Sequence, residues 1–117
     1  MLSDKFLENK VILITGGGTG LGKSMALQCA QRGAKVVISG RRKEVLEETA
    51  NEITKVTSQI LPIQSDVREP DQVQNMVDET VKKFGTIDAL INNAAGNFIC
   101  PAEKLSVNGW NAVINIV

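Results

Sequence analysis

Four short apolar runs alternate with longer segments of helical periodicity, and this alternation limits the possible folds more than any other feature. The runs are VILIT, KVVIS, ILPIQ and IDALIN, at residues 11–15, 35–39, 60–64 and 87–92. Runs of this kind are typical of strands that are buried on both faces. Helical patterns follow the first three runs, up to about Arg32, over 41–57 and over 70–84. The order strand, helix, strand predicts right-handed crossovers and therefore a parallel sheet between helices.

The spacing of apolar residues predicts which face of each helix packs on the sheet. In the first helix this stripe is Leu21, Met25 and Cys29, with Ala26 and Ala30 beside it. In the second helix it is Leu46, Ala50 and Ile53, and in the third it is Val73, Met76, Val77, Val81 and Phe84. Pro62 lacks the N–H group that a strand ladder needs, so we expect the third strand at or near a sheet edge.

The last quarter of the chain predicts a loop and a fourth helix. Residues 93–104 form the expected loop, and Ser106 is the expected N-cap of a helix that continues to Val117. This helical pattern ends inside an apolar stripe without a stop signal, and the fourth strand would leave an apolar edge open. We therefore expect an incomplete α/β fold, a Rossmann-type doubly wound parallel sheet with four strands and about four helices.

Composition excludes several classes of function. The 13 basic and 13 acidic residues cancel, which argues against nucleic-acid and membrane partners. The sequence contains no His and no Tyr, so imidazole and phenol groups are excluded as acids or bases. Cys29 and Cys100 have no metal-type spacing, so no metal site is expected. The first ten residues resemble neither a signal peptide nor a transit peptide, which predicts a cytoplasmic protein.

The glycine-rich segment after the first strand fits two patterns of phosphate-binding loop. Gly17-x-x-x-x-Gly22-Lys23-Ser24 matches the P-loop of nucleoside triphosphatases, in which Lys23 would reach the terminal phosphates and Ser24 would bind magnesium. Thr15-Gly16-x-x-x-Gly20-x-Gly22 instead matches a dinucleotide-binding loop. A P-loop protein also needs an acid at the end of an apolar strand, and the fourth strand ends in Asn92. The dinucleotide interpretation is therefore favoured.

The end of the second strand predicts which dinucleotide binds. Here a carboxylate would accept the ribose 2′-hydroxyl of NAD, but the chain has Gly40 followed by Arg41 and Arg42. A guanidinium fork suits a 2′-phosphate, which favours NADP(H). The alternative is that both arginines are ordinary surface residues at a helix entry. Cations at that position oppose the helix dipole at a cost of ~0.3–1 kcal/mol, which weakens this alternative.

Three loop motifs at successive strand ends resemble those of the short-chain dehydrogenase/reductase family. They are the glycine motif that begins at Thr15, Asp66-Val67 after the third strand, and Asn92-Asn93-Ala94-Ala95-Gly96 after the fourth. The resemblance implies that residues 1–117 are the N-terminal NADP-binding part of one Rossmann-fold reductase domain. It also implies the cofactor-binding residues: Thr15, Gly16, Gly17, Gly18, Thr19, Gly20, Leu21, Gly22, Arg41, Arg42, Asp66, Val67, Asn93, Ala94, Ala95 and Gly96.

Ala95-Gly96 and the segment after it resemble the 2,4-dienoyl-CoA reductase branch, whose members reduce conjugated fatty acyl-CoA with NADPH. The resemblance implies that Arg68, Asn97 and Phe98 lie toward an acyl-CoA substrate, although for Arg68 a surface role is an equal alternative. It also implies a tetramer and a catalytic Tyr-x-x-x-Lys pair. Since the chain has no Tyr, we expect no catalytic residue within it and no activity of these 117 residues alone. A non-catalytic nucleotide-binding fragment remains the alternative.

Overall fold

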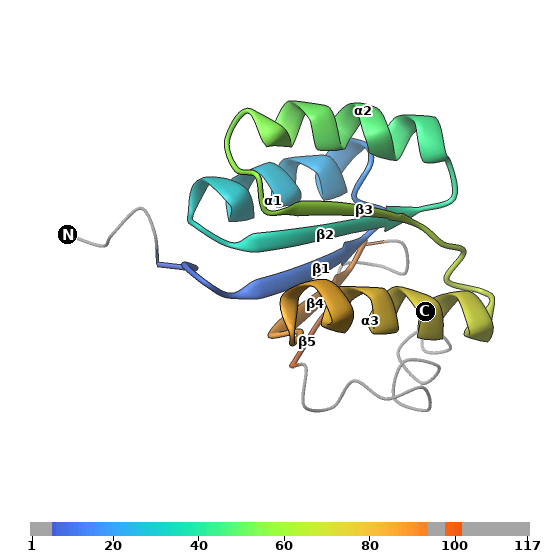
Figure 1. Ribbon diagram of the computed structural model, residues 1–117. Helices are drawn as coiled ribbons and strands as arrows, with labels where there is room; N and C mark the ends of the chain where they lie inside the picture. The colour runs from blue at the N-terminus through green and yellow to red at the C-terminus, as the bar shows by residue number, and fades with distance from the viewer. Residues whose placement is uncertain (1–5, 94–97, 102–117) are drawn as a thin grey trace.

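The computed structural model describes residues 6–93 and 98–101, which form a five-stranded sheet with helices on both faces (Figure 1). The strands are β1 (Val11–Thr15), β2 (Lys35–Gly40), β3 (Ile60–Gln64), β4 (Ala89–Asn92) and β5 (Phe98–Pro101). The helices are α1 (Gly20–Gln31), α2 (Lys43–Thr54) and α3 (Pro70–Phe84). Helices α1 and α2 cover one face of the sheet and α3 covers the other. The expected fourth helix from Ser106 lies outside the described residues.

The strand order is β3-β2-β1-β4-β5, and the first four strands pair in parallel, which confirms the predicted Rossmann-type sheet. All five residues of the central strand β1 are buried, because it has a neighbour on each side and helices on both faces. Strand β3 lies at the sheet edge, as Pro62 predicts, and Ile60, Leu61 and Pro62 are half-buried.

The prediction that residues 98–101 belong to a loop is wrong. Phe98–Pro101 form β5, which pairs antiparallel with β4 from Ala89↔Pro101 to Asn92↔Phe98. The expectation of an open β4 edge is therefore also wrong. The segment FIC is apolar and follows β4 closely, so it can fold back and pair with the backbone groups of that edge. A strand of only four residues gives too short a pattern to separate from a loop in the sequence.

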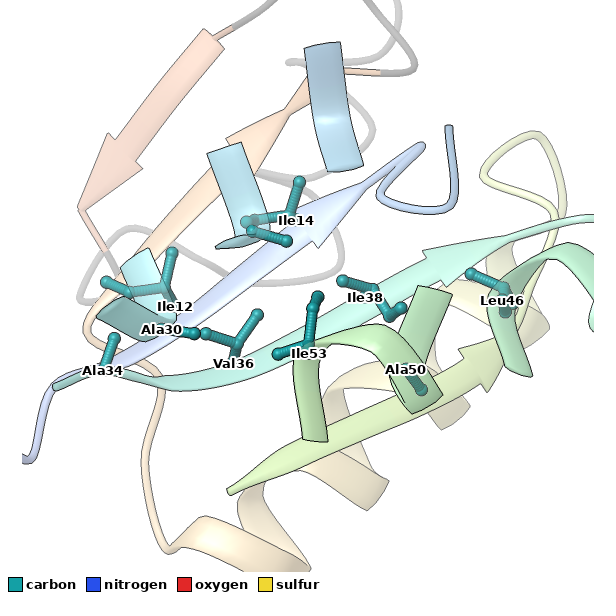
Figure 2. Close-up of a cluster of buried hydrophobic side chains, with 10 residues drawn as sticks. Ile12, Ile14, Ala30, Ala34, Val36, Ile38, Leu46, Ala50 and Ile53 are labelled. Atoms are coloured by element: carbon teal, nitrogen blue, oxygen red, sulfur yellow. The ribbon is translucent and has the colours of Figure 1, made fainter. Parts of the chain in front are cut away.

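The core consists of two apolar layers, one on each face of the sheet. Side chains alternate along each strand, so β1 directs Ile12 and Ile14 to the α1 and α2 layer and Leu13 to the α3 layer. Figure 2 shows the first layer, where the predicted stripe of α2 is confirmed: Leu46, Ala50 and Ile53. The second layer is formed by Leu13, Val37, Ile63, Val73, Met76, Ile87 and Leu90.

Two details of the predicted helix faces are wrong. Helix α1 packs through Gly22, Ala26 and Ala30, and Leu21 is 56% exposed. The small side chains bring α1 close to the sheet and the glycine loop, and the predicted Met25 and Cys29 are half-buried against the same core layer. In α3, Thr80 is buried and Val81 is exposed. The Thr80 hydroxyl donates to the Met76 carbonyl at 2.7 Å, which removes the cost of burying this polar group.

Candidate functional site

The loops that follow β1, β2 and β3 meet at the carboxyl edge of the sheet, where parallel α/β folds bind ligands. Two adjoining clefts lie there, of about 380 and about 400 Å³. The outer cleft is lined by Gly16, Gly18, Thr19, Gly40, Arg41, Arg42, Val45 and Leu46. The inner cleft is lined by Gly16, Ser39, Gly40, Arg41, Ser65, Asp66, Val67 and Arg68. The fold thus brings together predicted residues from three separate loops, with Gly16, Gly40 and Arg41 shared between the clefts.

The glycine loop is held by its neighbours in a close-packed turn. A Cβ atom on Gly22 would lie 2.0 Å from the carbonyl oxygen of Gly16, so only glycine allows this approach of α1 to the turn. Gly20 has a left-handed backbone, with φ +55, and nothing lies within 4 Å of the Cβ position. The buried hydroxyl of Thr49, on α2, donates to the Gly18 carbonyl at 2.6 Å. The loop is therefore fixed before any ligand binds.

The ends of β1 and β4 are tied to each other by side chains. The Thr15 hydroxyl donates to the side-chain oxygen of Asn92 at 2.7 Å, and both residues are fully buried. Asn93 donates its side-chain amide to the Gly16 carbonyl at 3.2 Å. Thr15 therefore braces the sheet below the clefts, whereas Asn93 connects the loop after β4 to the glycine loop.

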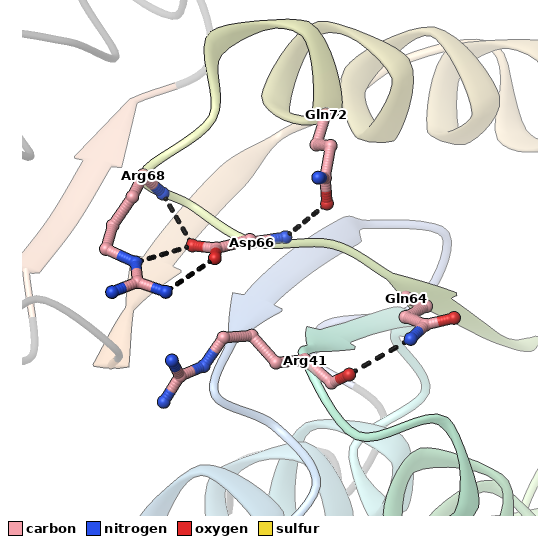
Figure 3. A network of polar contacts seen from close by, with 5 residues as sticks. All are labelled: Arg41, Gln64, Asp66, Arg68 and Gln72. Carbon is pink, nitrogen blue, oxygen red and sulfur yellow. Dashed lines mark hydrogen bonds and ion pairs between the residues drawn. The ribbon is translucent and has the colours of Figure 1, made fainter.

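Asp66, in the loop after β3, is held by hydrogen bonds to both its carboxylate and its backbone. Arg68 binds both carboxylate oxygens, Nε to Oδ1 at 3.0 Å and Nη2 to Oδ2 at 2.8 Å, and its backbone N–H donates to Oδ1 at 2.9 Å. The backbone N–H of Asp66 donates to the side-chain oxygen of Gln72 at 2.8 Å (Figure 3). The hydrogen bonds from Arg68 lower the pKa of the Asp66 carboxyl to about 2.

Arg41 and Arg42 lie exposed at the carboxyl end of β2, on the rim of the outer cleft. The backbone carbonyl of Arg41 accepts a hydrogen bond of 3.1 Å from the side-chain amide of Gln64, at the end of β3. The guanidinium groups of Arg41 and Arg68 point to the same side of this polar network (Figure 3). Arg41 and Arg42 therefore line the same cleft as Gly16, Gly18 and Thr19 of the glycine loop.

The P-loop alternative has no support in this geometry. Lys23 Nζ pairs with Glu52 at 2.8 Å, so this side chain reaches toward α2 instead of the loop. Strand β4 ends in the buried amide of Asn92 and carries no acid there. Within residues 6–93 and 98–101, no group of three His, Cys, Asp or Glu side chains could hold a metal ion.

Some predicted site residues lie elsewhere or cannot be placed. Leu21 is exposed and lines neither cleft, whereas Thr19 lines the outer cleft and Val67 lines the inner one. Phe98 belongs to β5, and residues 94–97 lie outside the described part of the chain. The residue patterns did not reveal the polar side chains that hold the loops: Thr49, Gln64 and Gln72. Each is a single polar residue whose partner lies in another loop, and no local pattern in the sequence records such a contact.

Comparison with known proteins agrees with this arrangement. Residues 10–117 match the family model for short chain dehydrogenases, and the chain belongs to this family. It is 54% identical over 111 residues to a probable 2,4-dienoyl-CoA reductase of Bacillus subtilis, covering 95% of this chain and 44% of the relative. It is 49% identical over 119 residues to probable 2,4-dienoyl-CoA reductase 3 of Caenorhabditis elegans, covering 100% and 38%. The chain therefore resembles the dienoyl-CoA reductase branch of the family.

Solved structures show the same fold. A short chain dehydrogenase from Bacillus anthracis shares 60% identity, with a TM-score of 0.74 over 95% of this chain and 45% of the other. A 3-ketoacyl-(acyl-carrier-protein) reductase from Brucella melitensis, complexed with NADH, shares 42% identity and a TM-score of 0.68 over 72% and 33%. The chain spans less than half the length of these relatives. In the part of the chain that the structure describes, no helix is long and apolar enough to cross a membrane.

Proposed function

We propose that this chain forms the NADP(H)-binding part of a short-chain oxidoreductase that reduces a 2,4-dienoyl-CoA or a similar acyl-CoA. The observation that carries the choice of NADP(H) is the charge of the two clefts. Arg41 and Arg42 stand on the rim, and Asp66 is the only acid among the described residues that line the clefts. Arg68 neutralises that acid. A 2′-phosphate would therefore meet two arginines and no unpaired carboxylate.

The remaining residues suit the other parts of a dinucleotide. The glycine loop precedes the N-terminus of α1, where backbone N–H groups favour a pyrophosphate, and the space beside Gly20 is open to it. Asp66 would accept a hydrogen bond from the adenine amino group, with Val67 beside the ring. The hydroxyl of Ser39, in the wall of the inner cleft, is buried without a hydrogen-bond partner among the described residues. An unsatisfied polar atom there is consistent with a ligand that supplies the missing contact.

The adenosine ribose would lie toward the loop after β4, and the family resemblance assigns its contacts to residues 93–96. The bound dinucleotide would supply a hydride to the substrate. Arg68, Asn97 and Phe98 are the residues that the resemblance places toward the acyl-CoA. The names of the relatives from Bacillus subtilis and Caenorhabditis elegans support this substrate class.

Turnover belongs to a longer protein in this proposal. These 117 residues have no Tyr to act as the acid of the family's Tyr-x-x-x-Lys pair, so we expect them to bind the dinucleotide without reducing a substrate. We expect a tetramer for the full reading frame. We propose that the protein is located in the cytoplasm. The relative from Danio rerio is named a peroxisomal 2,4-dienoyl-CoA reductase, so cell fractionation should test the cytoplasm against the peroxisome.

The decisive test uses the protein expressed from its full reading frame. Oxidation of NADPH, followed by absorbance, is expected with a 2,4-dienoyl-CoA and not with a saturated acyl-CoA of equal length. NADH should be the poorer donor. The 117-residue chain, assayed under the same conditions, should show no turnover. The proposal fails if the full-length protein oxidises neither nucleotide with the dienoyl-CoA, or if it prefers NADH.

A further inference from the structure

We propose that Arg68 determines cofactor specificity indirectly, by neutralising Asp66 and so leaving Arg41 unpaired for a 2′-phosphate. This inference rests on the proposed NADP(H) site. It differs from the role that the family resemblance gives Arg68, which is contact with the acyl-CoA. The proposal concerns three charged side chains that the structure places around the inner cleft, Arg41, Asp66 and Arg68.

The ion pair between Arg68 and Asp66 leaves part of the carboxylate free. A carboxylate has about four acceptor positions, and Arg68 uses three of those on Asp66. Two hydrogen bonds reach Oδ1, from the backbone N–H and from Nε of Arg68, and one reaches Oδ2, from Nη2. One acceptor position on Oδ2 remains, which is enough for one amino group. The carboxylate therefore keeps its acceptor role while its charge is compensated by a bidentate partner.

Without Arg68, Asp66 would carry an uncompensated charge near Arg41. The positive charge of Arg41 is close enough to contribute to the low pKa of Asp66, after the larger effects of Arg68. Among the described residues Arg41 forms no ion pair. If Arg68 were removed, Asp66 would therefore attract the Arg41 guanidinium and repel an incoming phosphate.

The backbone of Asp66 is held at the floor of the cleft. Its N–H donates to the side chain of Gln72 at 2.8 Å, and its carbonyl accepts from the N–H of Glu69 at 3.0 Å. These contacts do not involve the Arg68 side chain. Since the backbone N–H bond from residue 68 also survives substitution, a change at this position removes charge compensation and leaves the turn intact.

The test measures dissociation constants for NADPH and NADH by titration, in the protein expressed from its full reading frame. Arg68→Met should weaken NADPH binding by about tenfold at low salt, because the 2′-phosphate then meets an uncompensated carboxylate. NADH binding should change by less than about threefold, since it has no 2′-phosphate. The loss should shrink as salt is raised. Adding Asp66→Asn, which keeps an acceptor oxygen without the charge, should restore NADPH affinity to within about threefold of the wild-type value.

Lys43→Met serves as the matched control, because Lys43 is an exposed cation at the start of α2 that pairs with Glu47 and not with Asp66. Asp66→Asn should improve NADPH binding much more in the Arg68→Met background than in the Lys43→Met background. Arg68→Lys keeps the positive charge but not the bidentate geometry of the guanidinium group. Its affinity for NADPH should lie between those of the wild type and Arg68→Met. This variant keeps the inference testable if Arg68→Met does not fold.

The possible outcomes separate this inference from the proposed function. Wild-type protein that does not prefer NADPH contradicts the proposed function. If the wild-type protein prefers NADPH and the Arg68→Met variant keeps that preference, the proposed role of Arg68 is contradicted and the proposed function is not. That role is also contradicted if Asp66→Asn fails to rescue Arg68→Met, or if Arg68→Met raises only the KM for the acyl-CoA.

Discussion

The side-chain amide of Asn93 donates a hydrogen bond to the backbone carbonyl of Gly16, across 77 positions of sequence and 3.2 Å of space. This contact joins the loop after β4 to the glycine loop after β1. A Cβ atom on Gly22 would lie 2.8 Å from the same Asn93 nitrogen and 2.0 Å from the Gly16 carbonyl oxygen. Two motifs that are far apart in the sequence, the glycine loop and the loop after β4, therefore meet at one crowded point.

Gly22→Ala should destabilise the protein, because the new methyl group overlaps with the Gly16 carbonyl. We expect the free energy of unfolding to fall by about 1–3 kcal/mol, as in other overpacked sites, and nucleotide affinity to fall with it. Urea unfolding followed by circular dichroism measures the first effect. Gly20→Ala is the control. Its Cβ would meet nothing within 4 Å, so the substitution has only the cost of placing alanine in a left-handed backbone conformation. If Gly22→Ala lowers the free energy of unfolding by no more than Gly20→Ala does, the Gly16 carbonyl does not restrict residue 22 to glycine.

Thr49→Val should weaken the glycine loop through a single lost hydrogen bond. The buried Gly18 carbonyl would lose its donor at 2.6 Å, which costs about 1–3 kcal/mol in the free energy of unfolding. Thr54→Val, in the same helix, removes a hydroxyl that donates to the Ala50 carbonyl one turn earlier, at the helix surface. The Thr54 change should cost much less. If thermal unfolding shows that Thr49→Val and Thr54→Val lose the same stability, the Thr49 hydroxyl does not hold the glycine loop.

Asp66 should remain ionised in acid, because the hydrogen bonds from Arg68 lower its pKa to about 2 from the ordinary 3.8. A lowered pKa in the folded state means that the stabilising contribution of Asp66 is complete above its ordinary pKa and is lost as the pH falls through about 2. In Arg68→Met the pKa should move back toward the ordinary value. Carboxyl carbon shifts from an NMR titration measure both values. Wild-type Asp66 that titrates near its ordinary pKa would show that the ion pair does not form in solution.

The sheet and the positions of the main loops could be predicted because they depend on strong local patterns. Each parallel strand is a continuous apolar run, and the glycine loop, Arg41 and Asp66 each follow such a run directly. The edge position of β3 followed from Pro62, because a residue without an N–H group cannot complete the hydrogen-bond ladder of a central strand.

The parts that could not be predicted depend on contacts between distant residues. Strand β5 is four residues long and forms because the β4 edge is available to it, which no local pattern records. On α1 the assignment of Leu21 to the buried face was wrong, because close packing against the glycine loop selects small residues, whereas hydrophobicity alone favours leucine. The hydrogen bonds of Thr49 and Gln72 join loops that only the fold brings together.

The most direct test of the central claim compares 2′,5′-ADP with 5′-AMP, which differ in the 2′-phosphate alone. Calorimetry on wild-type protein should give at least about tenfold tighter binding of 2′,5′-ADP, the value of one charge-assisted hydrogen bond or more. Arg41→Ala should remove most of this preference and leave 5′-AMP binding unchanged, whereas Lys43→Ala should leave the preference intact. Equal affinities for the two ligands in wild-type protein, or an equal loss of both in Arg41→Ala, would contradict the assignment of this cleft to NADP(H).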